Sequence, residues 1–376
     1  MKILFTGGGT GGHIYPIIAV TREIKKICKN QELTFHYIGP KDNFGSALLS
    51  KEEIKIKTIM AGKVRRYIGI KSFFQNIIDI LFKTPIGICQ SFWYVFALAP
   101  ELIFSKGGYG SIPAVFSSWL LRIPIFLHES DTVAGLANRI LTKFSLEIFV
   151  SFPIQKTKFL PQEKLISIGN PIRTEILQGD KKEAQMLLKL SGVKPVILVL
   201  GGSQGAQRIN DKILEILPDF LREFEIIHQV GLKNLKGVQS EAKVAIPKEL
   251  EGYYHIFSIL DEKTLKNAYV ASDFIISRAG SGSIFEIAAL GKPSILIPLP
   301  ESAQNHQLKN AYCFAETGAS IVIEESNFTS HFFLEKLKHL FAQRQIMKEM
   351  SEKAKKFSRP KAAHIIAEYI VEYLKQ

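Results

Sequence analysis

The sequence predicts an α/β fold of two domains, each built on a doubly wound parallel β-sheet with helices on both faces. The chain has 376 residues, 46% of them hydrophobic, which suffices for two cores because a domain commonly holds about 100–200 residues. Short runs of valine, isoleucine, leucine and phenylalanine alternate with segments of helical length, which is typical of buried parallel strands joined by crossover helices. Glycine-rich turns follow several of these runs.

The predicted strands fall into two series, one in each half of the chain. Each run is short and largely apolar, which favours a strand covered on both faces. The first series is KILF (2–5), LTFHYIG (33–39), LIFS (102–105), IPIFLHE (123–129) and LEIFVSF (146–152). The second series is VILVL (196–200), EIIHQVG (225–231), YYHIFS (253–258), DFIISR (273–278), PSILIPL (293–299) and ASIVIEE (319–325).

The predicted domain boundary lies near ISIGNPIR (166–173), because glycine, asparagine and proline interrupt the strand pattern there. We therefore assign residues 1–168 to an N-terminal domain and residues 169–354 to a C-terminal domain. From about residue 330 the chain is helical and basic, and its last segment, RPKAAHIIAEYIVEYLKQ, places apolar side chains on one stripe. That stripe requires a groove to cover it.

The formal net charge of +13 points to an anionic partner: nucleic acid, a phosphorylated small molecule or an acidic lipid surface. No basic and aromatic motif supports the first of these, so we expect no nucleic-acid binding. The three cysteines are widely spaced and form no metal-binding or disulfide pattern. We expect a reduced compartment and, from the glycine-rich start of the chain, no signal peptide.

One segment raises the question of a membrane. Residues 84–100 carry no charge but include proline, glycine and glutamine, and they fall short of the roughly 20 apolar residues of a spanning helix. The preceding stretch, VRRYIGIKSFFQNIIDILFK (64–83), is basic and amphipathic. Such a segment binds an anionic bilayer interface, or forms an ordinary half-buried helix with solvated basic residues. The residues assigned to the membrane patch are Arg65, Arg66, Phe73, Phe74, Ile77 and Phe82.

Four glycine-rich turns follow predicted strands: GGGTGGH (7–13), KGGYGS (106–111), GGSQGA (201–206) and RAGSGS (278–283). In open α/β sheets, ligands bind outside the carboxyl ends of the strands, where helix N-termini offer free N–H groups to anions. A single such turn is weak evidence. Four in this position, two in each half, predict an anionic ligand.

Three nucleotide-binding signatures are missing from the sequence, and their absence narrows the type of anionic ligand. Residues 7–12 satisfy G-x-G-x-x-G, but the second predicted strand has no acidic residue at its tip and Asp42 comes late, which disfavours a dinucleotide. No Lys-Ser/Thr pair follows a glycine run, which disfavours a P-loop. No Asp-x-Asp is present to hold a metal under a diphosphate. We expect no cofactor or metal, and protein dipoles and cations to carry the charge of a nucleotide diphosphate.

Seven motifs together resemble the MurG family, in the same order and at similar spacing over residues 1 to about 320. MurG enzymes transfer N-acetylglucosamine from UDP-N-acetylglucosamine to undecaprenyl-linked muramyl pentapeptide, converting lipid I to lipid II in peptidoglycan synthesis. The motifs are GGTGGH, GGYGS, HESDTVAGLANR (128–139), GNPIR (169–173), GGSQGA, SRAGSGSIFEIAALGKP (277–293) and NHQLKNA (305–311).

The resemblance implies a GT-B architecture, in which two Rossmann-like domains face each other across a cleft and a C-terminal helix, about 355–376, crosses back to the N-terminal domain. It also implies an inverting, metal-independent transfer at the cytoplasmic face of the bacterial membrane. The acceptor C4 hydroxyl attacks the anomeric carbon and UDP leaves. This reaction needs a base near the acceptor and positive potential at the diphosphate. A lipid acceptor favours the membrane-patch interpretation of residues 65–96.

The resemblance implies a nucleotide site in the C-terminal domain. Glu286 would accept hydrogen bonds from the ribose hydroxyls, and Leu260 would contact the uracil. Ser203 would bind phosphate, although an N-cap serine has the same appearance in sequence. Arg173 would serve the donor, with a surface salt bridge as the alternative. The turn residues assigned to the same site are Ser281, Gly282, Ser283, Ile284 and Phe285.

Further positions are implied for the sugar and the acceptor. Thr10, Gly11 and Gly12 would lie near the sugar and the diphosphate, and Gln307 would reach the hydroxyls of the transferred sugar. Asn138 is assigned to substrate binding.

The chain departs from the family at Asp131, where the family usually has asparagine after HEQ and this chain reads HESD. Aspartate still accepts from a sugar hydroxyl, but it adds a charge and loses the amide donor. The catalytic base has several candidates. His13 ranks first because histidine titrates near neutral pH, and His128, Glu129 and Asp131 are rivals.

Two other classes of function remain open on the sequence. A non-catalytic UDP-sugar-binding module would keep Glu286, Ser203 and Gln307 but could lack the N-terminal glycine loop, which is present here. A glycosyltransferase with another lipid or natural-product acceptor would keep the C-terminal domain and change the GGYGS and HESD regions.

Overall fold

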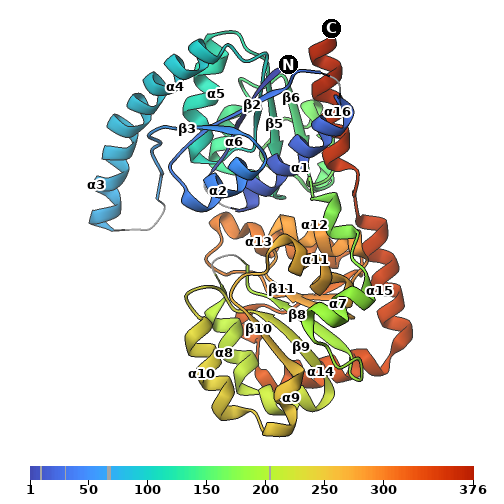
Figure 1. Cartoon of the computed structure of the whole chain (residues 1–376). Coiled ribbons are helices and arrows are strands. Elements are labelled where there is room, and N and C mark those ends of the chain that lie inside the picture. Colours follow the sequence, from blue (N-terminus) through green and yellow to red (C-terminus); the bar gives the residue numbers. More distant parts are fainter. Residues whose placement is uncertain (9–10, 30, 66–68, 203–204) are drawn as a thin grey trace. The chain divides into compact units, whose positions relative to one another are not determined.

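The computed structural model describes residues 1–8, 11–29, 31–65, 69–202 and 205–376. The chain forms two compact units (Figure 1): unit 1 is Met1–Arg173 with Arg359–Gln376, and unit 2 is Thr174–Ser358. The first unit thus extends to Arg173 rather than to residue 168. The reason is local packing, since the Gly169 carbonyl accepts a hydrogen bond from His128 and the Arg173 guanidinium lies over the Tyr15 ring.

In the described part of unit 1, seven parallel strands form one sheet in the order β3-β2-β1-β4-β5-β6-β7. All five strands predicted in the first half are present, and β3 and β7 are additional. The β3 sequence KIKT is mostly exposed, because it is an edge strand, where lysines protect the free edge from pairing. The strands are β1 (Lys2–Thr6), β2 (Thr34–Gly39), β3 (Lys55–Thr58), β4 (Leu102–Ser105), β5 (Ile125–Glu129), β6 (Glu147–Val150) and β7 (Leu165–Ser167).

The sheet of unit 2 contains, among the described residues, six parallel strands in the order β10-β9-β8-β11-β12-β13. All six strands predicted in the second half are present. They are β8 (Val196–Leu200), β9 (Glu225–Gln229), β10 (Tyr254–Phe257), β11 (Phe274–Ser277), β12 (Ser294–Leu296) and β13 (Ser320–Val322). The α/β fold class with two doubly wound parallel sheets is confirmed.

Helices cover both sheets, and local sequence explains several of their ends. Asp42, Asp180 and Asp261 each accept a hydrogen bond from a main-chain N–H of the first helical turn, as N-cap residues do. The unit 1 helices are α1 (Gly11–Ile27), α2 (Asn43–Lys51), α3 (Ile70–Ile78), the π-helical η1 (Asp79–Lys83), α4 (Thr84–Leu98), α5 (Ile112–Leu120), α6 (Leu136–Leu141) and α16 (Ala362–Lys375).

The remaining helices belong to unit 2, with short 3-10 turns in both units. The helices are α7 (Lys181–Leu188), α8 (Gln207–Glu215), α9 (Leu217–Glu223), α10 (Leu235–Ala245), α11 (Glu262–Ala271), α12 (Ser281–Leu290), α13 (His306–Ala315), α14 (Ser330–Ala342) and α15 (Arg344–Phe357). The 3-10 turns are η2 (Tyr109–Ser111), η3 (Ile154–Lys156), η4 (Gln162–Lys164), η5 (Thr174–Leu177), η6 (Lys248–Tyr253), η7 (Ala303–Asn305) and η8 (Glu325–Asn327).

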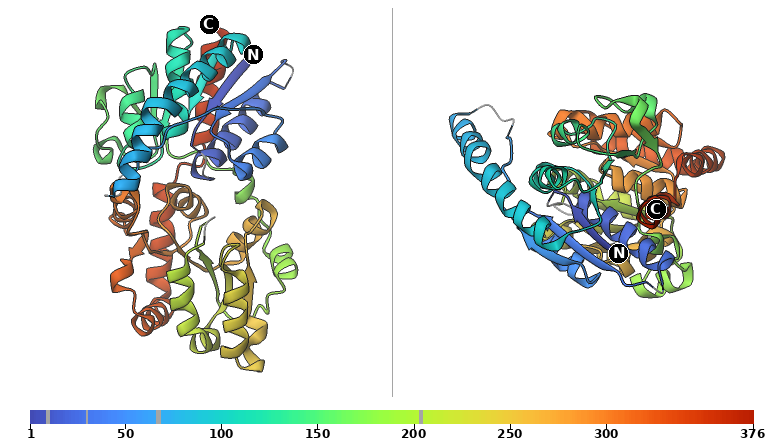
Figure 2. Two further views of the ribbon diagram at one scale, coloured as in Figure 1. Left: turned by 90° about the vertical axis from the view of Figure 1, so that its left-hand side faces the viewer. Right: turned by 90° about the horizontal axis from the view of Figure 1, so that it is seen from above.

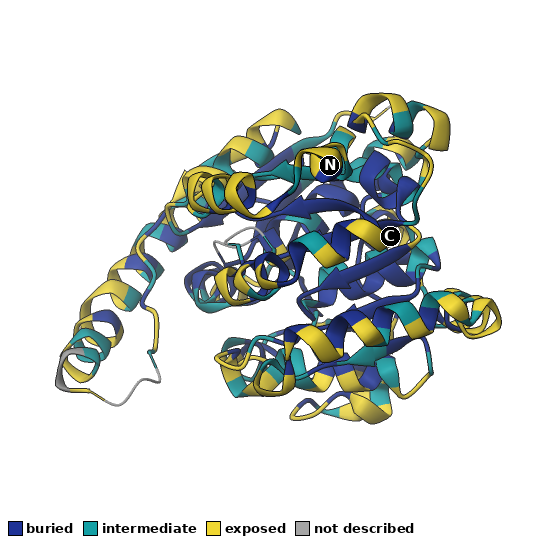
Figure 3. Cartoon of the chain, turned by 90° about the horizontal axis from the view of Figure 1, so that it is seen from below, coloured by how far each residue is buried: buried dark blue, intermediate teal, exposed yellow. Residues whose placement is uncertain are grey.

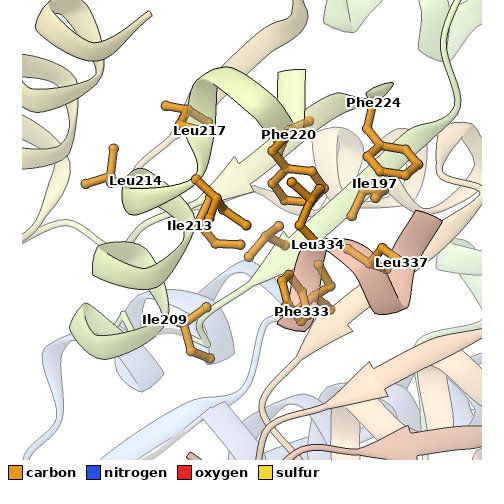
Figure 4. Close-up of a cluster of buried hydrophobic side chains, with 14 of the residues drawn as sticks. Ile197, Ile209, Ile213, Leu214, Leu217, Phe220, Phe224, Phe333, Leu334 and Leu337 are labelled. Atoms are coloured by element: carbon orange, nitrogen blue, oxygen red, sulfur yellow. The ribbon is translucent and has the colours of Figure 1, made fainter. Parts of the chain in front are cut away.

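Most strands are buried, whereas the helices alternate buried and exposed residues along their length (Figure 3). In unit 2, residues of α8, α9 and α14 pack against β8 in a cluster of leucine, isoleucine and phenylalanine side chains (Figure 4). In unit 1, separate clusters lie on the two faces of the sheet. Burial on both faces explains why the strands are almost continuously apolar.

The C-terminal helix α16 belongs to unit 1, where it lies beside α1 (Figures 1 and 2). Ile366 and Ile370 of the predicted stripe are fully buried. Tyr369 and Tyr373 lie at its edge, with rings 5.4 and 5.5 Å from those of Phe149 and Phe126. The expected return of the last helix to the first domain is confirmed.

Candidate active site

The four glycine-rich turns follow β1 and β4 in unit 1 and β8 and β11 in unit 2. In each sheet these two strands are the neighbours at which the strand order reverses. Thr6 pairs with Ser105, and Leu200 pairs with Ser277, so each pair of turns starts side by side. Ligands of open α/β sheets bind at this switch point. Thr10 and Ser203, which the sequence assigns to the donor, lie outside the described residues.

The glycines of the first two turns make room for the His13 ring. A Cβ atom on Gly8 would lie 3.0 Å from His13 Cε1, and one on Gly108 would lie 3.1 Å from His13 Nε2. Gly108 also has a φ of +81°, which favours glycine. His13 lies in the first turn of α1 and is partly exposed. Of the two residues before it, Gly12 is exposed and Gly11 is buried.

Lys106, the first residue after β4, is a buried cation, only 2% exposed. Its Nζ donates to Ser130 Oγ at 2.6 Å and to His128 Nδ1. His128 is fully buried, and its Nε2 donates to the Gly169 carbonyl at 3.1 Å. Burial, together with the Lys106 charge, holds the pKa of His128 well below its usual value. Both ring nitrogens of His128 are therefore engaged, and the ring is neutral.

Glu129, at the end of β5, organises the loop that follows it. Its carboxylate accepts hydrogen bonds from Asp131 N at 2.9 Å, Gly135 N at 3.1 Å and Asn138 Nδ2 at 2.8 Å. Burial, and next the Asp131 charge, raise the pKa of Glu129. The Asn138 side chain is itself buried. Glu129 thus fixes the loop that presents Asp131, which is partly exposed.

Charges within unit 1 shift the titration of His13 and Lys106. Burial and the Lys106 ammonium lower the pKa of His13 to about 4, while the Asp131 carboxylate opposes this shift. Burial lowers the pKa of Lys106 to about 7, while Glu129 and Asp131 oppose it. We call His13, Lys106, His128, Glu129 and Asp131 the His13 cluster. Perturbed titration in one cluster at a switch point is typical of functional sites.

Arg173 lies in unit 1 and is buried, with its guanidinium carbon 4.0 Å from the centre of the Tyr15 ring. Tyr15 is on α1, two residues after His13. The cation–π contact fixes the guanidinium near the first turn of α1. Arg173 therefore belongs with the His13 side of the molecule, whereas its sequence position placed it in the second domain.

In unit 2, Glu286 lies on α12, the helix that begins at the fourth glycine-rich turn. Its Oε2 accepts a hydrogen bond from Tyr269 Oη at 2.8 Å, and Glu286 is partly exposed. The Ile284 and Phe285 side chains are buried, so only their main-chain atoms can reach a ligand. Of the preceding turn residues, Ser281 is buried, and Gly282 and Ser283 are partly exposed.

Gln229, which the sequence analysis missed, connects two parts of the unit 2 site. Its Nε2 donates to the Gly202 carbonyl at 3.2 Å, and its Oε1 accepts from Leu260 N at 3.2 Å. Leu260 is 5% exposed. The sequence feature that could have indicated Gln229 is its position as a polar residue at the carboxyl end of the buried strand EIIHQ. The turn after β8 and the Leu260 loop are thus held together by one side chain.

Gln307 lies in the first turn of α13 and is held by the loop before it. Its Oε1 accepts from Leu299 N at 3.0 Å, and its main-chain N donates to Ser302 Oγ at 3.3 Å. Gln304 and Asn305 both have positive φ, 57° and 55°, a conformation that is costly for residues other than glycine. Strain of this kind concentrates in functional loops.

Arg278, at the end of β11, is a second residue that the sequence analysis missed. It is buried, and its Nη1 donates to Glu325 Oε2 at 2.6 Å and to two main-chain carbonyls of the loop after β12. Arg208 of α8 forms ion pairs with Glu325 Oε1 at 2.6 Å and with Glu301 Oε1 at 2.5 Å. Glu325 thus connects α8, which follows the third turn, to the start of the fourth turn, and the two guanidinium charges face two carboxylates.

The apolar residues of the predicted membrane patch lie on one continuous helical stretch, α3-η1-α4, and Arg65 precedes this stretch. Phe73, Phe74 and Phe82 are 62%, 59% and 59% exposed, whereas Ile77 is half-buried. Arg65 and Lys83 pair with the buried Asp79 at 2.7 and 2.6 Å. Asp79 therefore neutralises one of these two positive charges. Further exposed apolar side chains on the stretch are Ile78, Ile80, Leu81, Ile86, Trp93 and Phe96. Arg66 lies outside the described residues.

Two searches over the described part of the chain gave negative results. No helix there is long and apolar enough to cross a membrane. No group of three or more histidine, cysteine or acidic side chains there is arranged to hold a metal ion.

Comparison with protein families gives two matches. Residues 3–150 match the glycosyltransferase family 28 N-terminal domain, and residues 196–366 match the glycosyltransferase family 28 C-terminal domain. A Bacillus anthracis protein named UDP-N-acetylglucosamine–N-acetylmuramyl-(pentapeptide) pyrophosphoryl-undecaprenol N-acetylglucosamine transferase 2 is 37% identical over 373 residues, 99% of each chain. A Clostridium tetani protein with the same name, without the numeral, is 35% identical over 345 residues, 92% of this chain and 91% of its own.

Solved structures show the same fold. The crystal structure of Acinetobacter baumannii MurG has a TM-score of 0.72 at 23% identity and covers 99% of both chains. The UDP-GlcNAc 2-epimerase of Neisseria meningitidis, solved with UDP-GlcNAc bound, has a TM-score of 0.66 at 15% identity and covers 99% of this chain and 100% of its own.

Proposed function

The chain belongs to glycosyltransferase family 28 and, within it, to the MurG family, and on this premise we propose that it converts lipid I to lipid II. It is an N-acetylglucosaminyltransferase that moves the sugar from UDP-N-acetylglucosamine to the C4 hydroxyl of undecaprenyl-pyrophosphoryl-N-acetylmuramyl-pentapeptide. The observation that carries this function is the match to the Bacillus anthracis enzyme along 99% of both chains. The glycine-rich turns at both switch points support it, since they suit a nucleotide diphosphate.

His13 is the proposed base. The residue is partly exposed, and its pKa of about 4 leaves the ring neutral near pH 7, as a proton acceptor must be. His128 uses both ring nitrogens inside the protein, and the Glu129 carboxylate accepts three hydrogen bonds from its own loop. In the transfer, the acceptor O4 gives its proton to His13 and bonds to the anomeric carbon. The bond from that carbon to the diphosphate breaks, and UDP leaves with the electron pair.

The donor is proposed to bind at the turns of unit 2. Glu286 accepts from the ribose hydroxyls, while Tyr269 orients its carboxylate through the 2.8 Å hydrogen bond. The uracil is placed near Leu260, whose buried side chain leaves the main chain of its loop for contact. Ser203 and the main chain of Ser281–Phe285 bind phosphate and ribose, and Gln307 binds sugar hydroxyls. Proposed contacts from unit 1 are Thr10, Gly11, Gly12, Asp131, Asn138 and Arg173.

The exposed side chains of α3-η1-α4 are proposed to dock the enzyme on the cytoplasmic face of the bacterial membrane, as a peripheral protein. Three exposed phenylalanines, with Trp93 and Phe96 farther along the stretch, form the apolar surface that interfacial binding needs. Asp79 neutralises one of the two charges of Arg65 and Lys83, but Lys63, Arg66 and Lys71 keep the segment basic. Apolar contact and attraction to anionic lipid therefore both contribute to binding.

The experiment that tests the function is a transfer assay with labelled UDP-N-acetylglucosamine and a lipid I analogue. We expect label in the lipid product, an unchanged rate in EDTA, and little inhibition by UDP-N-acetylgalactosamine. A second arm offers acceptors that lack the muramyl pentapeptide. No transfer to lipid I under any condition, or transfer only to those other acceptors, would overturn the proposed function.

A further inference from the structure

Lys106 is a buried lysine whose pKa is lowered to about 7, and in its ammonium form its hydrogen bonds go to neutral groups. It is 2% exposed, and its partners within the described residues are Ser130 Oγ and His128 Nδ1. Burying a charge is costly unless an opposite charge compensates it. The compensating charge must come from a carboxylate close to, but not in direct contact with, the ammonium.

The carboxylates of Glu129 and Asp131 both act on Lys106, and both oppose the lowering of its pKa. Glu129 already accepts three hydrogen bonds from its loop, and burial raises its own pKa. Asp131 is partly exposed and follows Ser130, the residue that accepts the Lys106 hydrogen bond. Asp131 is therefore the carboxylate that is left to balance the charge of Lys106.

The backbone that carries Lys106 also encloses His13. A Cβ atom on Gly7 would lie 3.3 Å from His13 Cβ and 3.4 Å from Lys106 Cβ, so both side chains leave the backbone beside Gly7. Gly108, two residues after Lys106, lies against His13 Nε2. The two charges act on His13 in opposite directions, since Lys106 lowers its pKa and Asp131 raises it. The other titratable groups of the cluster are His128, which is neutral, and Glu129.

We propose that Lys106 and Asp131 form an opposed charge pair around His13, which sets how readily the imidazole takes the acceptor proton, with Lys106 as a positioning residue. This inference rests on the proposed function, in which His13 is the base. It also accounts for the departure from the family at position 131. The charge of Asp131 is matched by a buried cation in the same cluster.

The test compares Lys106→Met, Asp131→Asn and the double variant by NMR titration of the His13 ring in the full chain without substrate, and by the acid limb of the kcat/KM profile. Lys106→Met should raise the pKa of His13 by about 1 and move the acid limb to higher pH, since a like charge is removed. Asp131→Asn should move both in the other direction. The double variant should return both close to wild type, and Lys106→Arg should keep the wild-type pKa of His13.

Lys2→Met is the matched control, because Lys2 lies at the opposite end of β1, where its Nζ donates to the Leu98 carbonyl at 2.6 Å. It should leave the His13 titration unchanged. Should Lys106→Met prevent folding, Asp131→Asn and Lys106→Arg still decide the question. An unshifted His13 titration in Asp131→Asn, a raised pKa of His13 in Lys106→Arg, or an acid limb that does not follow the titration would overturn the proposal. The titration needs no substrate, so a wild-type protein without transfer activity would refute the proposed function separately.

Discussion

At the scale of single residues, the candidates for the base differ in burial, since His128 and Glu129 are buried and His13 is partly exposed. Both nitrogens of His128 are bonded within unit 1, and Glu129 binds its own loop. His13 is partly exposed, and its ring lies against Gly8 and Gly108. A side chain on either glycine would displace the imidazole, so the glycine runs position the ring as well as offering N–H groups to an anion.

Replacing His13 with alanine should lower kcat about 10²- to 10⁴-fold, the usual contribution of a general base. The dissociation constant of UDP-N-acetylglucosamine, measured by calorimetry, should change little, because the proposed nucleotide contacts are elsewhere. Glu286→Gln should instead raise the dissociation constant of UDP-N-acetylglucosamine, because the proposed role of the Glu286 carboxylate is to accept from the ribose hydroxyls. An unchanged kcat with weakened donor binding in His13→Ala would contradict the role of His13.

The sequence could name His13, His128, Glu129 and Asp131 as candidates but could not rank them on contacts. Their ranking depends on burial and on hydrogen bonds across the sheet, such as the one from His128 to the Gly169 carbonyl. Tyr269 was missed for a similar reason. A buried tyrosine on a helix has no sequence signal until the fold brings its hydroxyl to a carboxylate.

At the scale of elements, the strands and the glycine-rich turns were predictable because their signals are local. All eleven predicted strands form, and the turns follow the strands at which the order reverses. The exposed edge strand β3 and the short β7 were missed, because KIKT and LIS lack a long apolar run. The register that places Lys106 beside Gly7 is a property of the assembled sheet.

The helical stretch α3-η1-α4 leads to a prediction on membrane binding. Phe73→Glu/Phe74→Glu should reduce flotation with liposomes that contain anionic lipid, because it replaces two exposed apolar side chains by charges that the bilayer interface repels. Flotation of wild type at increasing salt measures the electrostatic share. Flotation should weaken as salt increases, since residues 63–83 carry five basic residues and Asp79 offsets only one of these charges.

A matched control changes two exposed apolar side chains of unit 2, Phe332 and Val244, which are 57% and 90% exposed. Phe332→Glu/Val244→Glu should float like wild type. Equal losses in the two double variants, or no loss in either, would count against docking through Phe73 and Phe74.

At the scale of the whole molecule, the first unit is built from both ends of the chain. The helix α16 supplies Ile366, Ile370 and Val371 to the core that α1, β1 and β4 form. The apolar stripe of α16 was visible in the sequence, and the resemblance to the family indicated its destination. The stripe alone could not indicate that destination, because periodicity shows that one face of a helix is buried but not which element covers it.

Ile366→Ala should destabilise unit 1 by about 2–5 kcal/mol, the usual cost of truncating a fully buried isoleucine. Hydrogen exchange of β1 amides would measure this, with the amides of β8 as an internal reference that should not change. Glu372→Ala, on the exposed face of the same helix, should have an effect within about 0.5 kcal/mol. Equal destabilisation of β1 and β8 would argue against α16 as a part of unit 1 alone.

The position of α16 also has a consequence for biosynthesis. A ribosome adds roughly 5–20 residues per second, so α16 emerges tens of seconds after α1 has left the exit tunnel. During that interval the α1 surface that receives Ile366 and Ile370 is uncovered, while unit 2, which is continuous in sequence, can fold. The N-terminal unit is therefore the last to be completed, and its apolar α1 surface stays uncovered until the end of synthesis.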